Sequence, residues 1–192
     1  PCEPACRRTR VEEKPVAICR LKRVAADQRD DVTPLLPKVP QLKNGKRIAC
    51  VGAGCASLTV ANDLLPLGYE ITMFEQWGQA GGLMRTNIPS FRLPAQVLNE
   101  EIAMIVDRGV DLQLGARIES MQKLLSDGGF DAVFVGTGAP KGKELDLPGR
   151  KEGTANIHVG IDWLESLAFG HVDSIGKRVL IIGVGNTAMD CC

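Results

Sequence analysis

The chain has 192 residues, of which 44% are hydrophobic and 24% are charged. Its 23 basic and 23 acidic side chains leave a net charge of zero, so nothing in the composition indicates binding to nucleic acid or to an anionic membrane surface. No apolar run reaches the roughly 18 residues that a membrane-spanning helix needs, and the N-terminus lacks the apolar stretch of a signal peptide.

The N-terminal segment, residues 1–30, is polar and basic. Ile18, Leu21 and Ala25 recur at helical spacing, which predicts a helix within residues 15–28. Residues 31–45 are rich in proline and end in Asn-Gly, so they are predicted to form a linker or an extended crossing segment.

The seven cysteines are an odd number and are unevenly spread, which does not fit a disulfide framework. Three of them, Cys2, Cys6 and Cys19, crowd the first 19 residues. This crowding favours ligation of a metal or a cluster in a reducing compartment, and we therefore expect a cytoplasmic protein.

A change of pattern at Lys46 marks the start of an α/β region. Residues 46–54, KRIACVGAG, predict a buried strand followed by a turn, residues 55–68 a helix, and residues 69–75 a second strand that ends in an acid. This sequence of elements is a βαβ unit of about thirty residues.

The rest of the chain continues the alternation of helices and strands. Residues 76–94 form a long loop without a predicted element, and such loops are usually functional. An amphipathic helix (95–109), a strand (110–118), a short helix (120–129) and a buried strand (130–140) follow. A last strand, turn and helix start are predicted within residues 171–192.

The first glycine-rich turn has the form G-x-G-x-x-S rather than the full G-x-G-x-x-G. Gly52 suits a tight turn after the strand, Gly54 allows close approach of a pyrophosphate, and the following helix amides would face its charge. Glu75 lies 23 residues after Gly52, at the end of the next strand, where an acid accepts hydrogen bonds from a ribose. Dinucleotide binding is therefore predicted for this turn, which consists of Gly52, Ala53, Gly54, Cys55, Ala56 and Ser57; the alternative is an ordinary tight βα turn.

A second turn of the same design lies near the C-terminus, at Gly183, Gly185, Asn186 and Thr187. Two such fingerprints about 131 residues apart indicate a flavoprotein with two nucleotide sites, the first for FAD and the second for NAD(P)H. On this interpretation residues 46–172 form the first part of an FAD-binding domain and residues 173–192 the beginning of an NAD(P)-binding domain. We also expect this chain to be a fragment of a longer one.

The motifs CEPACRR, PVAICRLKR, VGAGCAS, GGLMRTNIPSFRLP, VGTGAP and IGVGNTAMD occur in an order that resembles one oxidoreductase family. That family contains the small (beta) subunit of bacterial glutamate synthase, the amino-terminal half of dihydropyrimidine dehydrogenase and the large subunit of a bifurcating ferredoxin:NADP oxidoreductase. The resemblance extends over most of the chain and implies an FAD, NAD(P)H and [4Fe–4S] electron-transfer protein.

The resemblance also implies FAD contacts outside the first turn, at Gly82, Leu83, Arg92, Ile118 and Gly138. Each has a plainer alternative: a surface ion pair for Arg92, strand core for Ile118 and a simple turn for Gly138.

Cys55 stands where relatives usually have Pro. We expect it to be a small buried residue rather than a redox-active thiol.

By the same resemblance, residues 1–30 end a small helical domain that holds two [4Fe–4S] clusters, with Cys2 and Cys6 as ligands. The family's Glu or Gln ligand on the next helix corresponds to Lys22, which cannot ligate. Cys19 lies one helical turn earlier and is predicted to replace it, the alternative being a free thiol.

The function that we expect is an electron-transfer subunit that passes electrons between NAD(P)H, FAD and clusters, to or from a partner oxidoreductase subunit. A bifurcating transhydrogenase-type subunit and a non-catalytic docking subunit are the alternatives. The sequence does not separate NAD from NADP.

Overall fold

The computed structural model describes residues 2–172 and 174–192. The chain forms two compact units, Pro1–Pro37 and Lys38–Cys192. Within the described residues, no helix combines the length and the apolar character needed to cross a bilayer.

The N-terminal unit contains two α-helices, α1 (Thr9–Glu12) and α2 (Ile18–Asp27), and the short 3-10 helix η1 (Thr33–Leu35). Helix α2 lies within the predicted range 15–28. It carries an Arg23–Asp27 ion pair of 2.7 Å between residues one helical turn apart, a spacing that modestly stabilises helices.

The larger unit is built on a parallel sheet of β1 (Arg47–Val51), β2 (Glu70–Glu75), β3 (Val110–Leu114) and β4 (Ala132–Val135). The strand order is β3-β2-β1-β4, and Val51 at the end of β1 pairs with Phe74 of β2 and Val135 of β4. The predicted α/β fold is therefore confirmed, with β1 in a central position where it is buried on both faces.

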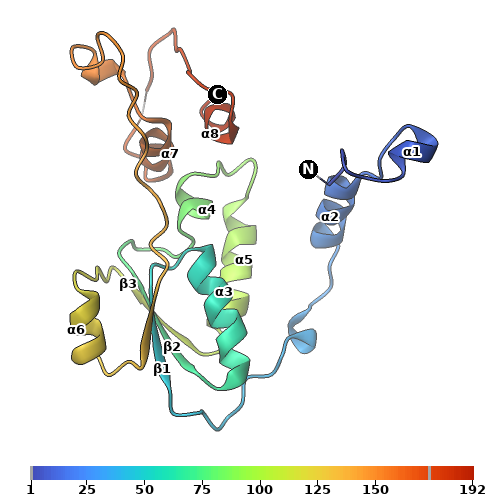
Figure 1. Ribbon diagram of the computed structural model, residues 1–192, viewed down its shortest axis with the longest axis vertical. Helices are drawn as coiled ribbons and strands as arrows, with labels where there is room; N and C mark the ends of the chain where they lie inside the picture. The colour runs from blue at the N-terminus through green and yellow to red at the C-terminus, as the bar shows by residue number, and fades with distance from the viewer. Residues whose placement is uncertain (1, 173) are drawn as a thin grey trace. The chain divides into compact units, whose positions relative to one another are not determined.

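Helices cover both faces of this sheet. Helices α3 (Cys55–Leu64) and α5 (Ala95–Val106) lie together on one side, and α6 (Met121–Ser126) lies on the other (Figure 1). The core between sheet and helices is continuous and consists mainly of Ile48, Cys50, Leu58, Ala61, Leu65, Ile71, Met73, Leu98, Ile102 and Val110. Several predicted elements are shorter in the structure; the strand from residue 110, for example, ends at Leu114 rather than at residue 118.

Four elements depart from the sequence prediction or add to it. A one-turn helix, α4 (Leu83–Thr86), interrupts the long loop 76–94, and two short 3-10 helices occur at η2 (Leu65–Leu67) and η3 (Thr154–Asn156). Helix α7 (Gly160–Ala168) was not predicted, although Ile161, Leu164 and Ala168 recur at helical spacing. It packs against α4 and against α8 (Asn186–Asp190).

The strand predicted before the second glycine turn does not form among the described residues of that segment. Val179, Leu180 and Ile182 are instead 59%, 85% and 66% exposed. A strand exists only where a neighbour accepts and donates its backbone hydrogen bonds, and the described residues provide none for this segment.

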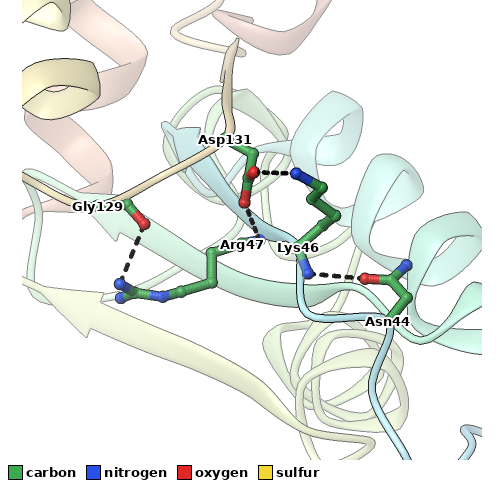
Figure 2. Close-up of polar contacts among 5 residues, drawn as sticks. All are labelled: Asn44, Lys46, Arg47, Gly129 and Asp131. Carbon is green, nitrogen blue, oxygen red and sulfur yellow. Dashed lines mark hydrogen bonds and ion pairs between the residues drawn. The ribbon is translucent and has the colours of Figure 1, made fainter.

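A polar cluster fastens β4 to β1 at the amino ends of the strands. The Asp131 carboxylate accepts hydrogen bonds from the Lys46 ammonium at 2.6 Å and the Arg47 amide at 2.9 Å (Figure 2). The Arg47 guanidinium donates to the Gly129 carbonyl at 3.1 Å and lies 4.7 Å above the Phe130 ring. The cluster therefore ties the start of the central strand to the segment that enters β4.

We predict that Asp131→Asn lowers the melting temperature, because the neutral amide loses the charged partnership with Lys46. The hydrogen bond from Lys46, and then that from the Arg47 amide, hold the pKa of Asp131 below its usual value. This contribution to stability is present above the unfolded pKa of roughly 3.9 and is lost as the pH falls through the native pKa. Thermal unfolding at several pH values checks this, with the exposed Asp146→Asn as control; equal melting temperatures for both variants at neutral pH would contradict it.

Candidate functional site

The first glycine turn leaves the carboxyl end of β1 in a conformation that only glycine adopts easily. Gly52 has φ of 93°, and its amide donates to the Phe74 carbonyl at 2.7 Å. A Cβ at this position would lie 2.6 Å from the Gly136 carbonyl oxygen. Gly52 therefore serves both the turn and the close approach of the segment that follows β4.

The backbones of two more glycines, Gly81 and Gly82, lie against this turn. The Gly81 amide donates to the Ala53 carbonyl at 2.8 Å, which draws the loop after β2 against the turn. Gly82 has φ of 52°, and a Cβ on it would lie 3.0 Å from the Gly54 Cα. The loop thus lies against the turn without any side chain between the two backbones.

Helix α3 begins at this point with unused amide donors. Gly54 is the N-cap and provides no side chain, and the Leu58 amide makes the bond to the Gly54 carbonyl at 3.1 Å. The amides of Cys55, Ala56 and Ser57 precede that bond. A helix start of this kind binds phosphate through its amides and its dipole.

The hydroxyl of Ser57 adds an unsatisfied polar group beside these amides. Ser57 is fully buried, and its Oγ has no hydrogen-bond partner among the described residues. The hydroxyl lies near Gly136, where a Cβ would come within 2.3 Å of it. The protein itself encloses this hydroxyl, so it marks the tight packing of α3 against the segment after β4 rather than a group open to a ligand.

The carboxylate of Glu75 is held in place by two backbone amides. Oε2 accepts from the Ala53 amide at 2.8 Å, and Oε1 accepts from the Trp77 amide at 3.0 Å. The residue is only 5% exposed. A carboxylate has about four acceptor positions, so each oxygen retains capacity for a further donor such as a ribose hydroxyl.

The other residues predicted to contact FAD lie in several segments of the larger unit. Leu83 begins α4 directly after Gly82 and is 41% exposed. Ile118 is half-buried and follows β3, beside the segment in which the Ala116 amide donates to the Glu75 carbonyl at 2.8 Å. Gly138 is exposed, with φ of 70° and open space around it.

Arg92 forms an ion pair with Asp190 of α8. The alternative interpretation of Arg92, as an ion-pair residue, is therefore supported. Its partner lies on a segment that is distant in the sequence. Cys55 was expected to be buried, but it is exposed because the first residue of α3 projects from the helix start.

A cavity of about 550 Å³ adjoins the loop after β2. Its walls come from α4 and the loop that follows it, from the start of α5, and from α7 and α8. Its apolar lining includes Met84, Ile88, Leu98, Leu164 and Phe169. Such a lining suits a flat, largely apolar ring more than a charged group.

The second glycine turn precedes α8. Gly183 has φ of 140°, and Gly185 is the N-cap of the helix that starts with Asn186 and Thr187. The helix has only 5 residues. The described residues provide no paired sheet before this turn, unlike the first one, and a nucleotide contact here stays a prediction.

The N-terminal thiols occupy a separate unit. All seven cysteines are free in the structure. Hydrogen bonds from the backbone of Val16, and then from that of Arg8, lower the pKa of the Cys6 thiol below its usual value. No three His, Cys, Asp or Glu side chains converge into a metal site within residues 2–172 and 174–192.

Comparison with known proteins decides the family. The family model for pyridine nucleotide-disulphide oxidoreductases matches residues 46–192. The chain belongs to this family.

Two of the three curated relatives described next, a glutamate synthase small chain and a dihydropyrimidine dehydrogenase subunit, are of kinds that the motif resemblance named. The chain is 36% identical to the NADP(+)-dependent formate dehydrogenase subunit beta of Moorella thermoacetica, over its full length and 30% of the relative's. It is 32% identical to the glutamate synthase [NADPH] small chain of Mycobacterium tuberculosis, over its full length and 41% of the relative's. It is 34% identical to the NAD-dependent dihydropyrimidine dehydrogenase subunit PreT of Salmonella typhimurium, over 98% of this chain and 45% of the relative's.

The resemblance drawn from the motifs is therefore confirmed, and the chain spans less than half the length of these relatives. Membership of the pyridine nucleotide-disulphide oxidoreductase family implies an oxidoreductase chain that binds FAD and NAD(P)H. The α3 amides that lack a partner among the described residues, together with the glycine cradle, fit the diphosphate of such a dinucleotide.

Sequence reasoning missed two residues that take part in the site. Trp77 supplies a backbone amide to Glu75, and its ring lies 5.0 Å from that of Phe169 at the end of α7. Asp190 supplies the carboxylate for Arg92. Trp77 lies outside the quoted motifs. Asp190 ends the motif IGVGNTAMD, but its partner Arg92 is 98 positions away, so the motif does not reveal the ion pair.

We predict that Gly52→Ala destabilises the fold by more than the roughly 1–3 kcal/mol that a positive φ alone costs a non-glycine residue. The added methyl group would also collide with the Gly136 backbone. Gly109→Ala is a matched control, because Gly109 has φ of 116° and no atom near its Cβ position. Urea unfolding measures both; equal losses would show that the close approach at Gly52 does not matter.

Proposed function

We propose that the turn of residues 52–57 binds the diphosphate of FAD. The observation that carries this proposal is the set of three amides at the start of α3, Cys55 to Ser57, that have no hydrogen-bond partner among the described residues. These groups are the donors that a diphosphate needs, and the opposed backbones of Gly54 and Gly82 leave space that no side chain fills.

Glu75 would accept hydrogen bonds from the adenosine ribose of FAD. Its carboxylate is already fixed by the Ala53 and Trp77 amides, so binding would cost little side-chain freedom. A fixed negative charge at this place also opposes a ribose that carries a 2′-phosphate. The first site therefore suits FAD and disfavours NADP.

The proposed FAD contacts outside the turn and Glu75 are Gly82, Leu83, Arg92, Ile118 and Gly138. The location of Gly82 against Gly54, and of Ile118 beyond the Glu75 end of the sheet, supports their inclusion. Arg92 would contribute a permanent positive charge to a phosphate or ring oxygen.

A nicotinamide nucleotide would bind at the second turn, with Gly183, Gly185, Asn186 and Thr187 as contacts. The positive φ of Gly183 and the N-cap position of Gly185 support this. Bound flavin would accept hydride from such a nucleotide and release electrons singly. The chain would then act as an electron-transfer subunit that serves a partner oxidoreductase subunit, as the subunit names of its relatives suggest.

Two alternatives remain, a bifurcating transhydrogenase-type subunit and a docking subunit that does not transfer electrons. The intact glycine cradle and the oriented Glu75 carboxylate favour a working flavin site over a docking role.

The N-terminal unit would supply Cys2, Cys6 and Cys19 as ligands of a [4Fe–4S] cluster. The lowered pKa of Cys6 favours the thiolate form, which is the form that binds iron. The Cys19 amide donates to the Glu3 carboxylate at 3.1 Å, so the start of α2 lies against the segment that carries Cys2 and Cys6. These contacts support the ligand set, although the thiols do not themselves converge.

We expect the purified chain to bind FAD with the visible flavin band and to quench flavin fluorescence on titration. Glu75→Gln should weaken FAD binding about tenfold and lower stability by about 1–3 kcal/mol, because its amide group would face a backbone donor in a buried place. Glu70→Gln, an exposed change at the start of the same strand, is the control. A wild-type chain that fails to bind FAD would reject the proposed function.

A separate measurement tests the cluster ligands. After anaerobic reconstitution with iron and sulfide, Cys19→Ser should lose bound iron and cluster absorbance relative to the wild-type chain. Cys192→Ser, which changes an exposed thiol in the other unit, should retain both. If Cys19→Ser keeps the wild-type iron content, Cys19 is not a ligand.

A further inference from the structure

Arg92 and Asp190 form an ion pair across 98 positions of sequence. Arg92 belongs to the loop between α4 and α5, and Asp190 ends α8, the helix that follows the second glycine turn. The pair is therefore a direct charged contact between a loop assigned to the first nucleotide site and an element assigned to the second.

The two partners differ in exposure. The side chain of Asp190 is 8% exposed, whereas that of Arg92 is 43% exposed. A nearly buried carboxylate needs its cation, because removing one partner of a buried pair leaves an uncompensated charge. The buried Asp190 carboxylate therefore needs the positive charge of Arg92, and the ion pair also fixes the position of the guanidinium.

The guanidinium retains donors for a second anion. Only its Nη1 donates to Asp190 among the contacts of the described residues. Arginine carries five N–H donors in a rigid planar fork, so the rest of the fork can serve another oxyanion at the same time.

Further contacts join the same two regions. The Asn87 side-chain amide donates to the Ile161 carbonyl of α7 at 2.7 Å. Helices α7 and α8 meet at Gly160, where a Cβ would lie 3.3 Å from the Thr187 methyl group. Asn87, Arg92, Ile161 and Asp190 thus form a clasp between the loop and the α7–α8 pair, and Asn87 and Asp190 also line the 550 Å³ cavity.

We propose that Asp190 is a positioning residue for flavin binding: it orients Arg92 through the clasp, so that occupancy of the first nucleotide site and the placement of α8 depend on each other. This rests on the proposed function, in which Arg92 contacts FAD. Asp190 itself does not touch the cofactor. Because linkage is reciprocal, FAD that gains from an oriented Arg92 also holds α8 against the loop.

The first test is FAD affinity, measured by quenching of flavin fluorescence with the full chain. Asp190→Asn keeps the size of the side chain but removes its charge, and should raise the Kd for FAD about tenfold. Asp190→Glu should restore part of the affinity. Asp162→Asn, an exposed change on α7, should leave the Kd within twofold of wild type.

The second test is hydrogen exchange of the segment 186–190. FAD should slow the exchange of these amides in the wild-type chain, and this protection should be absent in Asp190→Asn. A merely structural role for Asp190 would change stability without abolishing the dependence of α8 on FAD.

A double variant separates folding from coupling. Exchanging the charges, Arg92→Asp with Asp190→Arg, should recover thermal stability relative to either single change but not FAD affinity, because the side chain that faces the cofactor is then an acid.

The outcomes separate a failure of the proposed function from a failure of the positioning role of Asp190. A wild-type chain that does not quench flavin fluorescence rejects the proposed function and the clasp with it. FAD binding that is unaffected by Arg92→Ala, or by Asp190→Asn, overturns the positioning role and leaves the first FAD site in place. Absence of FAD-dependent protection at 186–190 in the wild-type chain likewise overturns the coupling alone.

Discussion

The carboxylate of Glu75 is the interaction on which the geometry of the first site depends. One of its oxygens holds the Ala53 amide of the glycine turn, and the other holds the Trp77 amide at the start of the following loop. Both bonds are charge-assisted and lie in a place from which water is nearly excluded, which strengthens them. The carboxylate thereby connects the ends of β1 and β2, so that the helix amides, the glycine backbones and the carboxylate itself keep one arrangement.

The sequence was sufficient to predict this part of the molecule, because its signals are local. The apolar run of β1, the helical spacing of α3 and the acid that ends β2 each follow from neighbouring residues. Gly52 could be predicted to form a tight turn because it directly follows a buried strand, and its positive φ agrees with this prediction. The resemblance implied an FAD contact at Gly82, but the closeness of Gly82 to Gly54 could not be predicted, because the two backbones belong to different segments.

What the sequence could not predict depends on partners remote in the chain. The runs RIACVGAG and RVLIIGVG look alike, yet the first is a central strand while Leu180 and Ile182 in the second are exposed. The difference lies in the neighbours, because β1 has a paired strand on each side and the second run has none among the described residues. The ion pair of Arg92 with Asp190 is equally invisible from spacing, since an arginine in a loop can meet any acid that the fold brings close.

The two glycine turns therefore differ in what holds them. The first is fixed by the backbone hydrogen bonds of the sheet and by the buried Glu75 carboxylate, which two backbone amides hold. Near the second, helices α7 and α8 are joined to the loop after α4 by side-chain contacts of Asn87 and Arg92. Side chains can change rotamer, so the elements that they join can adopt more than one arrangement. One site can respond to the occupancy of another only through an element of this kind. On the proposed function, the flavin would bind at the turn that the sheet fixes, and the second nucleotide at the turn whose surroundings side chains can rearrange.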